Sequence, residues 1–255
     1  MTNLHNSVVA VLENEVHIYH FNNLNVLASL YSVSSNGAGL CAMSGTGSIV
    51  LGLCGLAPGT LHVERVDPAA SRTAALTVQA HKKGISCIGV SPDGTLLVSA
   101  SSKGTLIRVF ESSSGKLVRE FRRGTGAMAV TSLAFSADNT TLVASSGTGT
   151  IHVFDMTAPH PLVCEKGKNR DRSIVRFHTA SPRTASWFGA SPSTVVIVSY
   201  DGKYSKYSYR TERDQRVAVP EVVDLNLFRL GDATVSSMAS ATGTTIVSDD
   251  IGLDG

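Results

Sequence analysis

A short glycine-led motif recurs in this sequence at a constant spacing. The motif Gly-Thr-Leu/Ile begins at Gly59, Gly104 and Gly149, so that consecutive copies are 45 residues apart. A second marker has the same spacing, because Ser-Pro-Asp-Gly-Thr at 91–95 is matched by Ser-Ala-Asp-Asn-Thr at 136–140. A period of this length in two independent markers indicates a fold built from repeated structural units.

Each repeat contains four short runs of alternating, often β-branched residues, separated by Gly, Asp, Asn or Ser. In the clearest repeat the runs are 85–90, 96–100, 106–110 and 116–121. Four antiparallel strands in such a repeat are typical of one blade of a β-propeller. A β-sandwich is the alternative, but it would not repeat a turn and a strand at constant spacing. We therefore predict an all-β protein, a propeller of four-stranded, WD-like blades.

The length of 255 residues predicts about five blades. We expect residues 1–230 to form the propeller, and the Gly-, Ser- and Thr-rich residues 231–255 to be a disordered tail. The first unit, near Ser7–Val33, lacks one of the four strands. Propellers commonly close with about four to eight blades, whereas an unclosed ring would leave an unpaired strand edge.

Composition excludes several classes of protein. The 22 basic and 20 acidic residues give a net charge of +2, which argues against a basic nucleic-acid-binding arm. The 42% of apolar and 16% of charged residues indicate a packed core. No apolar run approaches the length of a membrane-spanning helix, and the N-terminus lacks the basic region of a signal peptide.

No catalytic or metal-binding constellation is apparent, so we expect neither an enzyme nor a cofactor or metal site. Asp93, Asp138 and Asp201 occupy turns, where carboxylates are usually structural. The cysteines are widely spaced and are interpreted as reduced thiols of a cytoplasmic protein; they are Cys41, Cys54, Cys87 and Cys164.

The most chemically specific segment is Phe-Arg-Arg-Gly at 121–124, between the third and fourth units. Consecutive residues of an extended backbone project to opposite sides, so we expect Arg122 and Arg123 to serve separate pockets. Guanidinium groups suit phosphate because they donate two parallel hydrogen bonds and stay charged. The alternative is a solvated pair of loop charges.

Hydroxyl and basic side chains recur at matching positions of the two flanking units. They suit a phosphorylated sugar ring, since cations bind phosphate and hydroxyl groups bind ring oxygens. Serine and threonine after a strand also commonly form turns, so this alternative stays open. Upstream these residues are His81, Ser101, Lys103 and Arg108; downstream they are Thr131, Ser132, Ser145, Ser146, Thr148 and His152.

The segment Leu-Val-Arg-Glu-Phe-Arg-Arg-Gly-Thr at 117–125 resembles the FRRG motif of the PROPPINs, the WD-repeat phosphoinositide-binding propellers of autophagy. The resemblance spans about residues 7–210 and favours a functional role for Arg122 and Arg123. Family members usually have seven blades, whereas about five are visible here, so we expect the N-terminal blades of the family to be lacking: either the ring is shortened, or Met1 is not the natural start of a complete propeller. The other resembling segments are 8–14, 80–82, 99–110 and 144–154.

The resemblance implies two headgroup sites, one on each side of the arginine pair, for phosphatidylinositol 3-phosphate and the 3,5-bisphosphate. A histidine there would gain charge below pH ~6.5, although a core-packed ring is the alternative for His152. By residue match one site would contain His81, Ser101, Lys103, Arg108 and Arg122, and the other Thr131, Ser145, Ser146, Thr148, His152 and Arg123.

The loop at about 155–172 corresponds to the membrane-entering loop of the family. Apolar residues beside cations suit an anionic bilayer, at ~1 kcal/mol per cation near the headgroups, although an ordinary solvated loop is the alternative. The expected membrane-contact residues are Leu162, Val163, Lys166 and Lys168.

The leading interpretation is a non-enzymatic, cytoplasmic propeller that binds phosphoinositide-containing membranes and autophagy proteins, and no nucleic acid. It would lie peripherally on phagophore, endosomal or vacuolar membranes, where two weak sites and a loop act together at high effective concentration. The alternative is a lipid-independent scaffold whose arginines bind an acidic peptide.

Overall fold

The computed structural model describes residues 7–31, 36, 38–46, 48–67, 72–157, 173–179, 181–212 and 215–226. These residues form five antiparallel sheets, which we number blades 1 to 5 in chain order. Blade 1 has three strands in the order β1-β2-β3, and each later blade has four. The strands are β1 (Ser7–Val11), β2 (Glu15–His20) and β3 (Val26–Tyr31) in blade 1; β4 (Cys41–Met43), β5 (Ile49–Cys54), β6 (Thr60–Asp67) and β7 (Arg72–Gln79) in blade 2; β8 (Ile85–Val90), β9 (Leu96–Ser101), β10 (Leu106–Glu111) and β11 (Leu117–Arg122) in blade 3; β12 (Val130–Phe135), β13 (Thr141–Ser146), β14 (Thr150–Asp155) and β15 (Val175–His178) in blade 4; and β16 (Thr184–Phe188), β17 (Thr194–Ser199), β18 (Lys203–Glu212) and β19 (Gln215–Asn226) in blade 5.

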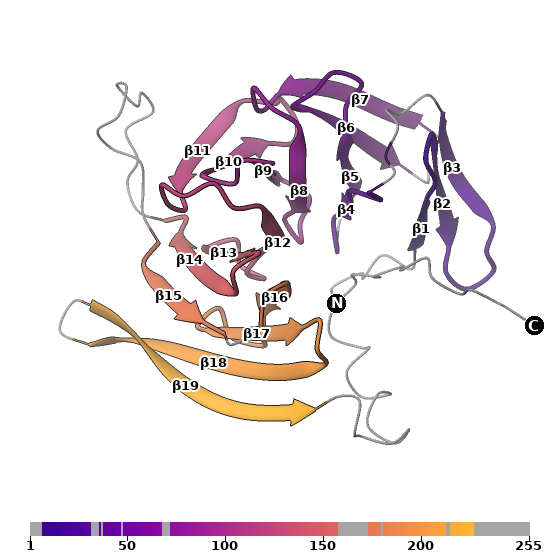
Figure 1. Ribbon diagram of the computed structural model, residues 1–255. Coiled ribbons are helices and arrows are strands. Elements are labelled where there is room, and N and C mark those ends of the chain that lie inside the picture. Colours follow the sequence, from indigo (N-terminus) through magenta and orange to yellow (C-terminus); the bar gives the residue numbers. More distant parts are fainter. Residues whose placement is uncertain are drawn as a thin grey trace, which may run out of the picture.

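The blades follow one another around an arc, from indigo blade 1 to orange blade 5, with β4, β8, β12 and β16 toward its centre (Figure 1). This confirms the predicted all-β propeller of about five visible blades. The strands of blade 3 begin and end within one residue of the predicted runs. The part of the chain that the structure describes contains no helix long and apolar enough to cross a membrane.

Within the described residues blade 1 has three strands, as expected for a first unit with one strand fewer. In the 45-residue repeat, Val-His-Ile at 16–18 in β2 corresponds to Leu-His-Val at 61–63 in β6. Because β6 is the third strand of blade 2, β1 corresponds to a second strand. The strand that blade 1 lacks among the described residues is therefore the innermost one.

The apolar core consists of layers between neighbouring blades. Side chains alternate along a strand, so each blade turns one set of residues to the preceding blade and the other set to the next. Ile107 and Phe121 of blade 3 pack with Phe154 of blade 4, and all three are fully buried. Ile151 of blade 4 packs with Val195 of blade 5 in the next layer. Each blade is thus held by its neighbours rather than by a single central core.

At the glycines of the repeated motif, the backbones of neighbouring blades come into close contact. Gly59, Gly104 and Gly149 have φ values of +78°, +64° and +77°, a conformation that favours glycine. The backbone of the segment that leads into the next blade lies directly against each of them. A Cβ on Gly59 would lie 2.0 Å from the carbonyl oxygen of His81, and one on Gly104 would lie 1.8 Å from that of Met128. The 45-residue period therefore records one close backbone contact for each of blades 2, 3 and 4.

Replacing Gly104 with alanine should lower the free energy of unfolding by about 2 kcal/mol or more. The left-handed conformation alone costs an L-residue about 1–2 kcal/mol, and the methyl group would also displace the Met128 carbonyl. Urea unfolding monitored by the fluorescence of Trp187 measures the change. Gly84→Ala is the matched control, because a Cβ there meets nothing within 4 Å. Equal stability of the two variants would contradict this account.

Candidate functional site

Strand β11 places Arg122 and Arg123 on different sides of blade 3. Phe121 packs against Phe154 of blade 4, with ring centroids 4.8 Å apart, so its side of β11 faces blade 4. Because side chains alternate, Glu120 and Arg122 face blade 2. Arg123 follows the last residue of the strand and extends on the blade 4 side, toward the segment that leads into β12.

Backbone carbonyl groups fix the guanidinium of Arg123. Its Nε donates to the carbonyl oxygen of Gly104 at 2.7 Å, and its Nη2 lies 2.7 Å from that of Gly126 and 3.2 Å from that of Met128. The side chain is buried, and this burial, followed by the charge of Arg176, lowers the pKa of Arg123. Arg123 is a fixed positive charge that also holds the connection between blades 3 and 4.

Other basic groups surround Arg123 on this side. His152 in β14 is opposite Arg176 in β15, and its Nδ1 lies 3.2 Å from the hydroxyl of Ser173. Burial lowers the pKa of His152 to about 3, followed by the charges of Arg176, Arg123 and His178. Every charged group that acts on this ring is basic, so the blade 3–4 side presents a positive potential suited to an anion.

A row of hydroxyl groups lies at the turn between β13 and β14 of blade 4. The Ser146 and Thr148 hydroxyls are 3.0 Å apart, and those of Thr148 and Thr150 are 3.4 Å apart. The Thr150 hydroxyl lies 3.3 Å from Nδ1 of His178. Hydroxyl groups both donate and accept hydrogen bonds, so this row could contact the ring hydroxyls of a phosphorylated sugar while the cations hold its phosphate.

On the blade 2 side, two of the residues are already paired. Nε2 of buried His81 lies 3.0 Å from the Ser99 hydroxyl, and burial, followed by the charge of Arg108, lowers the pKa of His81 to about 4. Arg108 forms an ion pair with Glu120 at 2.7 Å and donates from Nη1 to the Ala80 carbonyl oxygen at 2.6 Å. The charge of Arg108 is therefore largely compensated within the protein.

Three further residues predicted for the blade 2 side are Ser101, Lys103 and Arg122. Ser101 is buried at the end of β9 and shares the face of Ser99, two residues earlier. Lys103 is exposed on the turn between β9 and β10. No hydrogen bond or ion pair joins the partly buried Arg122 guanidinium to another described residue. Lys103 and Arg122 are thus the cations on this side that could neutralise an added anion.

The structure does not bring Thr131 and Ser145 to the side of Arg123. The Thr131 hydroxyl donates to the Thr184 carbonyl oxygen at 2.8 Å, and the Ser145 hydroxyl donates to the Ser186 hydroxyl at 2.6 Å. Both bonds join blade 4 to blade 5. Ser145 and Ser146 are consecutive strand residues, so their side chains point to opposite faces and cannot line one pocket.

The expectation that His81 and His152 gain charge below pH ~6.5 is wrong, because burial lowers both pKa values. The membrane-contact residues lie outside the described residues; they are Leu162, Val163, Lys166 and Lys168.

Sequence reasoning missed Arg176 and His178. The signal was present, because Val-Arg-Phe-His at 175–178 alternates buried apolar with exposed basic residues. The loop between β14 and β15 breaks the 45-residue period, however, so the repeat alone did not show that Arg176 is opposite His152.

Acid should destabilise the protein through these two histidines. The unfolded-state pKa is about 6.5, whereas the folded values are about 4 for His81 and about 3 for His152. Between the folded-state and unfolded-state pKa values, the unfolded chain binds more protons than the folded protein does. The free energy of unfolding therefore falls as the pH falls. We expect His81→Gln to reduce the loss between pH 7 and pH 5 by about 2 kcal/mol, measured by urea unfolding. An unchanged loss would contradict the buried, neutral state of His81.

Sequence comparisons identify the family of this chain. A model of the PROPPIN family matches residues 3–161. The chain is 38% identical over 147 residues to autophagy-related protein 18 of Dictyostelium discoideum, covering 58% of this chain and 39% of that protein. It is 32% identical over 218 residues to autophagy-related protein 18e of Arabidopsis thaliana, covering 79% and 56%. The chain thus spans about half the length of these relatives or less.

Solved structures share the fold. Kluyveromyces lactis Hsv2p superposes with a TM-score of 0.69 at 24% identity, covering 89% of this chain and 72% of that one. KlAtg21, solved in complex with a coiled coil of AgAtg16, gives 0.67 at 24% identity, covering 86% and 68%. The family match covers more than half of the chain and includes both Arg122 and Arg123. The chain therefore belongs to the PROPPIN family.

Proposed function

We propose that this propeller binds phosphatidylinositol 3-phosphate and the 3,5-bisphosphate, and that this recruits it to membranes as an autophagy adaptor. The observation that carries the proposal is the divergence of Arg122 and Arg123 from β11 to two sides of blade 3. Each side then has its own cation and can hold a separate headgroup, with no need for catalytic groups.

The blade 3–4 side is the stronger candidate. Arg123 is pre-oriented by three carbonyl groups, and Arg176 and His152 lie beside it. Such a pre-oriented arrangement lowers the cost of ordering side chains on binding. Burial and then repulsion among basic groups lower the pKa of His152, and a phosphate there would offset the repulsion.

The blade 2–3 side is simpler. Arg122 and Lys103 supply charge that Glu120 does not compensate, because Glu120 already pairs with Arg108. We assign Arg108 the role of holding the site wall, through Ala80 and Glu120, rather than of contacting phosphate. His81 would keep the neighbouring backbone in place through its bond to Ser99.

The partners follow from the family. Relatives of this chain are named autophagy-related proteins, and one structural neighbour was solved with a coiled coil of Atg16. We therefore propose autophagy proteins as partners and peripheral attachment to phagophore, endosomal or vacuolar membranes. Residues Leu162, Val163, Lys166 and Lys168 would add a membrane contact to the two headgroup sites.

Liposome flotation with and without phosphatidylinositol 3-phosphate tests the proposal. Wild type should float only with the lipid, Arg122→Ala and Arg123→Ala should each weaken binding about tenfold, and the double variant should lose it, because two linked sites bind far more tightly than one. Lys116→Ala, which removes an exposed cation at the far end of β11, should bind like wild type.

Two outcomes would contradict the proposal. Equal flotation of wild type and the double variant would show that the two arginines do not contribute to lipid binding. Absence of flotation together with an arginine-dependent pull-down of an acidic peptide would favour the lipid-independent scaffold instead.

A further inference from the structure

We propose that Asp201 of blade 5 is a positioning residue for the anion site on the Arg123 side, although it belongs to a different blade from Arg123. Asp201 holds Ser181, which precedes β16 and lies against the turn of blade 4 that contains Gly149. That turn carries the hydroxyl groups of the site. The inference rests on the proposed function of that site and names a residue that controls its affinity.

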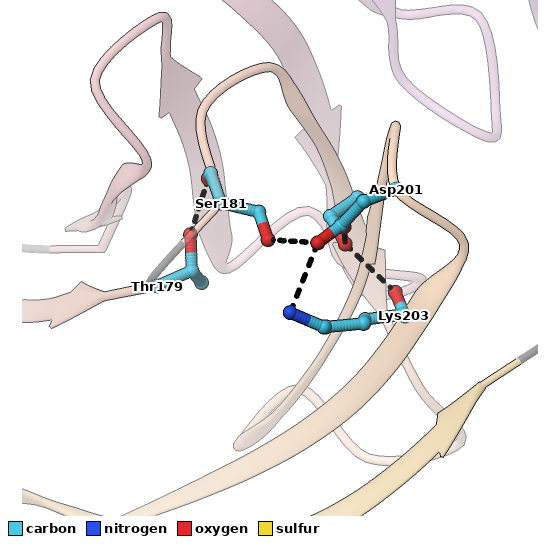
Figure 2. Close-up of polar contacts among 5 residues, drawn as sticks. Thr179, Ser181, Asp201 and Lys203 are labelled. Carbon is cyan, nitrogen blue, oxygen red and sulfur yellow. Dashed lines mark hydrogen bonds and ion pairs between the residues drawn. The ribbon is translucent and has the colours of Figure 1, made fainter.

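Figure 2 shows how Asp201 is held. The Ser181 hydroxyl donates to its Oδ2 at 2.7 Å, and Nζ of Lys203 lies 3.0 Å from the same oxygen. The Ser199 hydroxyl donates to Oδ1. These hydrogen bonds, that of Ser199 first, hold the pKa of Asp201 well below its usual range. Asp201 is therefore a carboxylate throughout the physiological pH range.

The next contacts lead from Ser181 to blade 4. The Thr179 backbone N–H donates to the Gly149 carbonyl oxygen at 2.9 Å. The Thr179 hydroxyl lies 3.1 Å from that oxygen. It also lies 3.0 Å from the Ser181 carbonyl oxygen (Figure 2). A Cβ on Gly149 would lie 2.7 Å from the Ser181 carbonyl oxygen, so the segment lies directly on this turn. Without the hydrogen bond from Ser181 to Asp201, Thr179 and Ser181 would be free to move away from Gly149.

The Gly149 turn fixes the candidate ligand groups. Thr148 and Thr150 flank Gly149 in the sequence, and their hydroxyls continue to Ser146 on one side and His178 on the other. His178 directly precedes Thr179, which the segment holds. A displacement of the segment would therefore change the spacing of the hydroxyls and of the basic ring at once.

The corresponding contact in blade 3 uses a different chemistry. There the segment leading into the blade carries His81, which bonds Ser99 on β9, and its backbone N–H donates to the Gly59 carbonyl oxygen at 2.9 Å. Blade 5 uses Asp201 with Ser181 and Ser199 instead. Asp201 thus acts on the Arg123 side, and the Arg122 side has an independent support.

The test measures each side separately. The probe is inositol 1,3-bisphosphate, the soluble headgroup of phosphatidylinositol 3-phosphate, titrated into 15N-labelled protein and followed at the amide signals of Gly149 and Gly104. In an Arg122→Ala background the Arg123 side remains, and Asp201→Ala should raise its dissociation constant about tenfold. In an Arg123→Ala background the Arg122 side remains, and Asp201→Ala should leave its dissociation constant unchanged.

Two further variants separate positioning from loss of structure. Asp201→Asn keeps one acceptor oxygen, enough for one of the two serine hydroxyls, and loses the ion pair with Lys203, so it should restore part of the affinity. Asp138→Ala is the matched control, because Asp138 accepts from the Ser136 hydroxyl at 2.6 Å in the turn between β12 and β13, remote from the Gly149 turn. It should leave the affinity of both sides unchanged.

The outcomes are distinguishable. If wild type does not bind the headgroup, the proposed function fails and this inference fails with it. If wild type binds but Asp201→Ala leaves the Arg123 side unchanged, this inference alone is overturned. Equal weakening of both sides by Asp201→Ala would also overturn it, since general destabilisation would then explain the effect.

Discussion

The arrangement of the blades depends on one close backbone contact, made where each Gly-Thr motif turns from the second strand to the third. The segment leading into the next blade lies so near Gly59, Gly104 and Gly149 that a single methyl group would collide with it. Apolar layers between blades supply most of the burial, but such layers tolerate changes in shape better than a backbone-to-backbone contact does. The glycine contacts therefore set how the blades stack.

The same contacts build the candidate site. The carbonyl oxygen of Gly104 accepts from Nε of Arg123, and the carbonyl oxygen of Gly149 accepts from the N–H of Thr179. Side chains that could meet an anion are thus attached to the points where blades touch. Because each blade has two faces, the step from Arg122 to Arg123 is enough to place one cation on each face at a single strand end.

The sequence predicted the strands of blade 3 closely, since their alternation and turn residues are local signals. Cross-strand pairing was not predictable in the same way: the ion pair of Arg108 with Glu120 depends on the register of β10 and β11. The low pKa values of His81 and His152 depend on burial between blades, which a sequence does not display.

The separation of Ser145 from Ser146 could have been predicted. The alternation that assigned Arg122 and Arg123 to different sides applies equally to these consecutive serines. The family resemblance grouped them because it matches positions along the chain, whereas a pocket requires side chains on one face. Arg176 could not be predicted for another reason. The loop before β15 changes the 45-residue spacing, so the repeat does not show which residue lies opposite His152.

The layered core also determines how unfolding would spread. In an array whose units contact only their neighbours, stability is approximately a sum of unit and interface terms, and the end units are the least supported. Among the described blades, blade 3 lies between blades 2 and 4 and packs against both (Figure 1). The arginine pair therefore belongs to a unit that is stabilised by interface terms on both of its faces.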